Sequence, residues 1–174
     1  MGRLAGGLAL ISALLTIIFT LPFWTFSTER AVSLAFLDNI TQEKAVVFFG
    51  FTHCGDVCPI SMAVLTKLFK NTKEQHQAQL PAVVFVDIDR NSNQLSAERF
   101  AKNFHKQFIG IYPDDETLAA MKVQFGLNIS QSGDVIQHRG RTYLLEKKSD
   151  KWQLTKAVNP QNLSKQWLEA QLTI

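Results

Sequence analysis

The hydrophobic positions of the chain begin with one long uninterrupted run. No charged residue occurs between Leu4 and Thr28, and a helix needs about 20 apolar residues to cross a bilayer. Trp24 lies at the far end of the run, where amphipathic rings favour the membrane interface. This pattern predicts one N-terminal transmembrane helix within residues 1–28.

A cleaved signal peptide is the competing interpretation, because Arg3 supplies a short positive segment before the apolar run. The run is longer than the roughly 7–15 residues of a signal peptide, and no A-x-A-like cleavage site follows it. We therefore favour an uncleaved anchor. Arg3 and the N-terminal amine are expected to keep the N-terminus in the cytoplasm. The expected location is a bacterial inner membrane, crossed once, with the C-terminal domain in the periplasm.

Beyond the anchor, strand-like and helix-like hydrophobic patterns follow one another. Continuous apolar runs predict strands that are buried on both faces, and apolar residues at helical spacing predict amphipathic helices. Pro59 suits the start of the first helix, and Gly126 the end of the third. The predicted strands are 44–51, 81–89, 134–148 and 151–158, the last two turning at Ser149-Asp150. The predicted helices are 59–71, 96–108 and 114–126, with a last one opening at Asn159-Pro160.

The order of these elements predicts an α/β fold. It is the order of a thioredoxin-like sandwich, in which helices flank a central mixed β-sheet. We expect the anchor at 1–28, a short linker at 29–43 and the thioredoxin-like domain at 44–174.

Charge narrows the range of partners. The net charge is +3, from 18 basic and 15 acidic residues, and the basic residues are scattered along the chain. The densest cluster, EKKSDK at 146–151, alternates in sign, as a solvated hairpin tip does. The sequence therefore predicts no nucleic-acid partner.

The residues best suited to redox chemistry or metal binding lie in FTHCGDVCPI at 51–60, which holds both cysteines of the chain. The pair can be a structural disulfide, a redox couple or two ligands of a soft metal. Cys54 lies just after the first predicted strand, and Cys58 lies at the beginning of the first predicted helix. A helix N-terminus stabilises a thiolate, which is the form that attacks disulfides and the form that binds metals.

Spacing and context weigh against the redox enzymes. The pair is C-x-x-x-C, one residue longer than the thioredoxin-type C-x-x-C. Thioredoxin-like oxidoreductases also carry a cis-proline before a later strand, whereas ISQSGDVIQHRGRTYLL contains no proline but has His138. Two thiolates and one imidazole suit Cu(I) and can also hold Cu(II). Zinc usually takes a fourth ligand, which an aspartate can provide.

The stretch FFGFTHCGDVCPISMAVL resembles the signature of the SCO/SenC family of membrane-anchored copper proteins. VVFVDIDR, FIGI, MKVQFGL and HRGRTYLLEK are also similar to that family, over roughly residues 44–170. The chain departs from the family at Gly55, which replaces a proline, and at DIDRNSNQ, which lacks the family's prolines. The β-hairpin that normally precedes the first strand is almost absent.

The resemblance implies a function and a set of ligands. Cys54, Cys58 and His138 would hold one copper ion, with Asp56 as the acidic residue between the cysteines. The protein would be a metallochaperone rather than an enzyme. It would deliver copper to a respiratory cuproprotein such as the cytochrome c oxidase subunit that carries CuA. The alternative is a periplasmic thiol–disulfide oxidoreductase that reduces the cysteines of a cuproprotein before metallation, with Cys54 and Cys58 as its redox pair.

Overall fold

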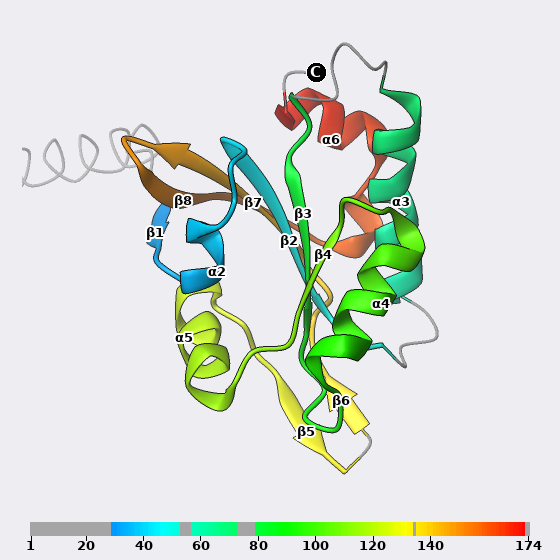
Figure 1. Cartoon of the computed structure of the whole chain (residues 1–174), viewed down its shortest axis with the longest axis vertical. Coiled ribbons are helices and arrows are strands. Elements are labelled where there is room, and N and C mark those ends of the chain that lie inside the picture. Colours follow the sequence, from blue (N-terminus) through cyan, green and yellow to red (C-terminus); the bar gives the residue numbers. More distant parts are fainter. Residues whose placement is uncertain (1–28, 53–56, 73–78, 134, 173–174) are drawn as a thin grey trace, which may run out of the picture.

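The main feature of the fold is a six-stranded mixed sheet with the strand order β1-β8-β7-β2-β3-β4. The computed structural model (Figure 1) describes residues 29–52, 57–72, 79–133 and 135–172. The sheet strands are β1 (Arg30–Val32), β2 (Lys44–Gly50), β3 (Ala82–Asp87), β4 (Ile109–Ile111), β7 (Thr142–Lys148) and β8 (Lys151–Val158). A separate hairpin comprises β5 (Ser130–Ser132) and β6 (Val135–Gln137). The helices are α2 (Ala35–Asp38), α3 (Val57–Asn71), α4 (Gln94–Phe104), α5 (Asp115–Phe125), the 3-10 helix η3 (Pro160–Asn162) and α6 (Lys165–Leu172).

Helices cover both faces of the sheet, which explains the continuous apolar runs in its central strands. β2 pairs in parallel with β3 and antiparallel with β7. Along β2, Val47 and Phe49 join the cluster that includes residues of α2 and α5, whereas Val46 and Phe48 join the cluster with α3, α4 and α6. Successive strand residues point to opposite faces, so every position of β2 meets a helix layer. The predicted mixed α/β sandwich is confirmed.

The linker expected at residues 29–43 is corrected by the structure. Within it, β1 pairs antiparallel with β8, and Leu37 of α2 is 1% exposed. The indole Nε1 of Trp152 donates a hydrogen bond of 3.2 Å to the carbonyl of Leu37. These residues therefore belong to the domain. Elements of three or four residues are too short to show a hydrophobic period.

Several predicted boundaries need adjustment, among them the helix expected over 96–108, which is α4 at Gln94–Phe104, and two turn signals are confirmed. Helix α3 begins at Val57, so Pro59 is its third residue, where the missing N–H still costs no intrahelical bond. The strand expected over 134–148 is interrupted between β6 and β7. Gly126 ends α5 at φ 63°, and the β7–β8 turn places Ser149 and Asp150 at positive φ.

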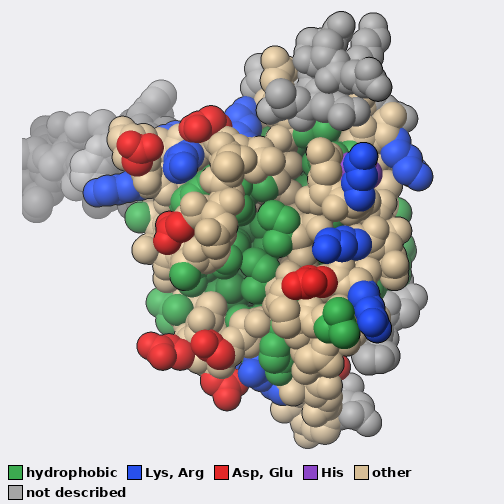
Figure 2. All heavy atoms as spheres, viewed as in Figure 1, with side chains coloured by type: hydrophobic (Ala, Val, Ile, Leu, Met, Phe, Trp, Pro, Cys, Tyr) green, Lys and Arg blue, Asp and Glu red, His purple; other side chains and the backbone are tan. Residues whose placement is uncertain are grey.

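The outer edge of the sheet at β4 is closed by a side chain. The amide of Gln94 donates to the carbonyl of Gly110 at 2.9 Å and accepts from the N–H of Tyr112 at 2.8 Å. It thus takes the place of a neighbouring strand, which is one way in which proteins protect an open edge. Figure 2 shows hydrophobic side chains gathered on this face between α2 and α4.

Among the residues that the structure describes, no helix has the length and apolar character of a membrane span. The anchor predicted at 1–28 lies outside those residues.

Candidate metal site

Cys58 is the described member of the cysteine pair, and it lies in the first turn of α3. Its side chain is fully buried. A Cβ added to Gly50 would lie 2.8 Å from Cys58 Sγ, so the sulfur sits directly against the end of β2. Only glycine at position 50 allows this close approach. Cys54 and Asp56, the other predicted residues of the motif, lie outside the described residues.

His138 lies in the short connection between β6 and β7 and is partly buried. Its ring centroid is 5.7 Å from that of Phe51, with an edge-on angle of 76°. Removal from solvent lowers the pKa of His138 below its usual 6.5. The neutral ring, which is the form that binds metals, is therefore favoured at neutral pH.

The hydrogen bond of the His138 ring decides its tautomer. Nδ1 accepts the backbone N–H of Gly140 at 2.9 Å, so the ring proton of the neutral imidazole belongs on Nε2. A metal bound at Nδ1 would displace the Gly140 N–H. A metal bound at Nε2 would move the proton to Nδ1, where it would face that N–H. Either mode of ligation exchanges the Gly140 hydrogen bond for the metal bond.

The two described ligand candidates lie near the same end of β2. Cys58 lies against Gly50, and His138 lies against Phe51, the next residue along the chain. Phe51 packs against the cluster on the α5 side of the sheet, and Cys58 belongs to the cluster on the α3 side. The two candidates therefore flank the end of β2 from its two faces. Within the described part of the chain, no group of three or more His, Cys, Asp or Glu is placed to hold a metal ion; the predicted set needs Cys54 as well.

A buried hydroxyl adds a polar atom to the Cys58 side of the sheet. Thr142 is the first residue of β7 and is opposite Phe48 of β2. Its side chain is 0% exposed, and among the described residues its hydroxyl has no hydrogen-bond partner. A buried polar atom in this state is costly. The sequence carried no signal of it, since threonine is an ordinary strand residue.

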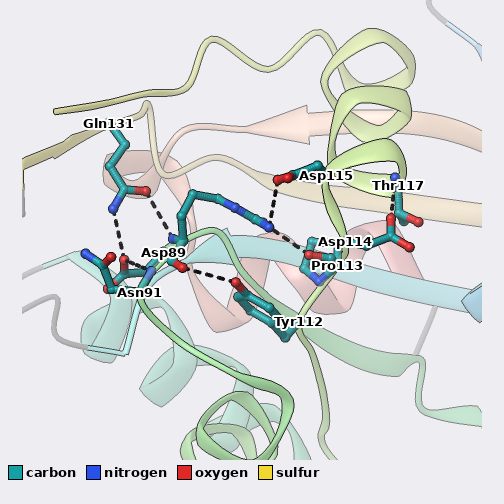
Figure 3. Close-up of polar contacts among 9 residues, drawn as sticks. Asp89, Asn91, Tyr112, Pro113, Asp114, Asp115, Thr117 and Gln131 are labelled. Atoms are coloured by element: carbon teal, nitrogen blue, oxygen red, sulfur yellow. Dashed lines mark hydrogen bonds and ion pairs between the residues drawn. The ribbon is translucent and has the colours of Figure 1, made fainter. Parts of the chain in front are cut away.

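The hairpin that precedes His138 is tied to the β3–α4 loop by Gln131, which sequence reasoning missed (Figure 3). Gln131 Nε2 donates to Asp89 Oδ1 at 3.0 Å, and Gln131 Oε1 accepts the N–H of Arg90 at 3.1 Å. A hairpin of two three-residue strands is marginal alone. This tie therefore helps to fix β6, which leads directly into His138.

The β3–α4 loop, to which Gln131 is hydrogen-bonded, is itself held in place by side-chain contacts, as Figure 3 also shows. The guanidinium of Arg90 donates to the carbonyl of Pro113 at 3.1 Å and pairs with Asp115 at 2.8 Å. The hydroxyl of Tyr112 donates to the carbonyl of Arg90 at 3.2 Å. The stretch DIDRNSNQ thus holds its shape without the family's prolines, through side-chain contacts.

Comparisons with known proteins show which family this chain resembles. Residues 35–171 match the SCO1/SenC family. A SCO2-like protein of Rickettsia prowazekii is 26% identical over 117 residues, which are 63% of this chain and 57% of that relative. The chain thus spans little more than half the length of that relative.

Solved structures show the same fold. Apo Sco1 of Thermus thermophilus has a TM-score of 0.66 and 25% identity, covering 83% of this chain and 88% of that one. Copper-bound ScoI of Arabidopsis thaliana has a TM-score of 0.62 and 22% identity, covering 78% of this chain and 85% of that one. With the family match over most of the domain and the shared thioredoxin-like sandwich, the chain belongs to the SCO1/SenC family.

Proposed function

We propose that this protein binds one copper ion through Cys54, Cys58 and His138 and delivers it to a respiratory cuproprotein. The recipient we propose is the cytochrome c oxidase subunit that carries CuA. The observation that carries the proposal is that Cys58 lies against Gly50, the last residue of β2, and His138 lies against Phe51, the next residue along the chain. Family membership and the copper-bound Arabidopsis neighbour support the choice of metal.

The donor set suits copper as a cargo. Two thiolates and one neutral imidazole are soft enough to hold Cu(I). The positive end of α3 favours the thiolate of Cys58, and the lowered pKa of His138 keeps its ring available. A recipient's thiolates or imidazoles would replace the three ligands one at a time. Asp56 would contribute negative charge beside the thiolates.

We further propose the setting in which this happens. The apolar run within 1–28 would anchor the chain once in a bacterial inner membrane, with the domain in the periplasm. A periplasmic domain can receive copper outside the reducing cytoplasm, and its thiols must be reduced before they bind metal.

Anaerobic titration of the full chain with Cu(I) tests the binding step. One tightly bound copper per chain is expected, and a Cys54→Ala/Cys58→Ala variant should lose it. X-ray absorption of the loaded protein should report two sulfur ligands and one nitrogen ligand. Equal copper binding by the wild type and the double variant would contradict the proposal.

His138→Ala separates delivery from thiol chemistry. If the protein is a copper carrier, the variant should lose the nitrogen ligand and deliver copper poorly. If it is instead a thiol–disulfide oxidoreductase, reduction of a disulfide in the recipient should survive the change, because Cys54 and Cys58 remain.

A further inference from the structure

A shallow groove lies between the first turns of α3 and the segment that follows His138. It encloses about 550 Å³ and is lined by Ile60, Arg139, Arg141, Asn159, Pro160 and Gln161. Ile60 is two residues beyond Cys58 on α3, and Arg139 directly follows His138. The groove therefore joins the start of α3 to the segment that carries His138. A protein that exchanges ligands with residues on these two segments would bind near this surface.

The groove combines an apolar anchor point with positive charge. Ile60 is 60% exposed, although a large aliphatic side chain on a helix usually faces the core. Arg139 is exposed, and Arg141 is held by a hydrogen bond of 2.9 Å from its Nε to Asn159 Oδ1. Ile60 and Pro160 give the groove apolar surface beside charged and polar side chains, a combination found in protein contact sites.

The charges of the groove indicate the chemistry of its partner. None of its six lining residues is acidic, and two of them are arginines. A guanidinium presents a planar fork of donors that matches a carboxylate with two parallel hydrogen bonds. A partner surface with carboxylates beside an apolar side chain fits this groove, whereas a basic surface would be repelled.

We propose that this groove is the docking face for the copper recipient, and that it binds a surface carrying Asp or Glu side chains around an apolar residue. The inference rests on the proposed function, because it assigns a partner to the same site. Ile60 supplies the apolar contact, and Arg139 and Arg141 supply the charge complementarity. Such complementarity acts mainly on the rate of encounter.

The test is a copper-transfer assay with a defined recipient. The full chain, loaded with Cu(I), is mixed with the metal-free soluble CuA domain of the host's cytochrome c oxidase, and the second-order rate of transfer is followed. Arg139→Glu should slow transfer about tenfold or more at low salt, and added salt should slow the wild type. Arg139→Lys should retain most of the rate. The matched control is Arg99→Glu, which makes the same charge change at an exposed position of α4 outside the groove.

Copper affinity is measured for every variant, so that slower docking is distinguished from weaker binding. Transfer by Arg139→Glu at the rate of Arg99→Glu would overturn the docking face and leave the copper function intact. The absence of any salt effect on transfer by the wild type would also overturn the docking face. Failure of the wild-type chain to bind copper would overturn the proposed function itself. Copper binding without transfer to the CuA domain would overturn delivery and docking together.

Discussion

Gly50→Ala tests whether the Cys58 sulfur sits against the end of β2. The added methyl carbon would lie 2.8 Å from Cys58 Sγ, 2.8 Å from the ring of Phe48 and 3.1 Å from that of Phe85. All three neighbours are fully buried, and β2 is paired with β3 at this residue. The strand therefore cannot shift away, so the first turn of α3 and the two phenylalanine rings must move instead.

The magnitude follows from overpacking in a well-packed core, which typically costs about 1–3 kcal/mol. We expect Gly50→Ala to lower the free energy of unfolding by about 2 kcal/mol, which for a chain of this size lowers the Tm by roughly 4–8 °C. Part of this loss of stability comes from the steric contact between the added methyl group and Cys58 Sγ. Removing the sulfur should relieve that part.

A double-mutant cycle isolates the contact with sulfur. Urea unfolding of the metal-free, reduced protein is measured for Gly50→Ala, Cys58→Ala and the double variant. The double variant should be more stable than the sum of the single effects predicts, by about 1 kcal/mol. The control is Gly133→Ala, whose Cβ meets nothing within 4 Å and whose cost comes from the positive φ of 57°; its effect should add to that of Cys58→Ala. Additivity of Gly50→Ala and Cys58→Ala within about 0.3 kcal/mol would refute the placement of the sulfur.

Three further predictions concern the residues around His138 and β7. Gln131→Ala removes the hydrogen bonds to Asp89 and Arg90 and should lower the free energy of urea unfolding by about 2 kcal/mol. Amide exchange in the β5–β6 hairpin should become faster; unchanged exchange would show that these hydrogen bonds do not hold the hairpin. Thr142→Val removes a buried hydroxyl without a partner among the described residues and should stabilise the protein by about 1 kcal/mol, whereas Thr66→Val, whose hydroxyl donates to the Met62 carbonyl at 2.9 Å, should destabilise it by a similar amount. Burial lowers the pKa of His138 below 6.5. As the pH falls, His138 therefore takes up a proton in the unfolded chain before it does so in the folded one. The contribution of the neutral His138 ring to the free energy of unfolding is present above pH 6.5 and is lost below it. His138→Asn should therefore flatten the fall in Tm below pH 6.5, and an unchanged pH profile would contradict the lowered pKa.

The sequence predicted the elements whose signal is local. The continuous apolar runs predicted β2 and β3 because both faces of these strands meet helices. Gly126 and the pair Ser149-Asp150 marked chain reversals because their backbone conformations favour particular residue types. The cysteine motif indicated a soft-metal or redox site, because its residue types and spacing limit the chemistry available.

Elements formed by distant contacts were not visible in the sequence. β1 and α2 are too short to show periodicity, and they form because β8 offers a partner strand and Trp152 a bond to Leu37. The break between β6 and β7 leaves His138 outside both strands, where its ring accepts the N–H of Gly140. Neither arrangement is encoded in a local pattern.

The sequence alone indicated the components of the protein: an α/β domain, a cysteine pair at the first strand–helix junction, and His138 as a candidate third ligand. Only the tertiary structure decided where these groups lie. The sulfur of Cys58 packs against Gly50, and the ring of His138 packs against Phe51. Gln131 hydrogen-bonds the hairpin that precedes His138 to Asp89. The physical reason is that a metal site depends on where side chains distant in the chain come together. Packing against the end of β2 sets those positions, and no short-range pattern records them.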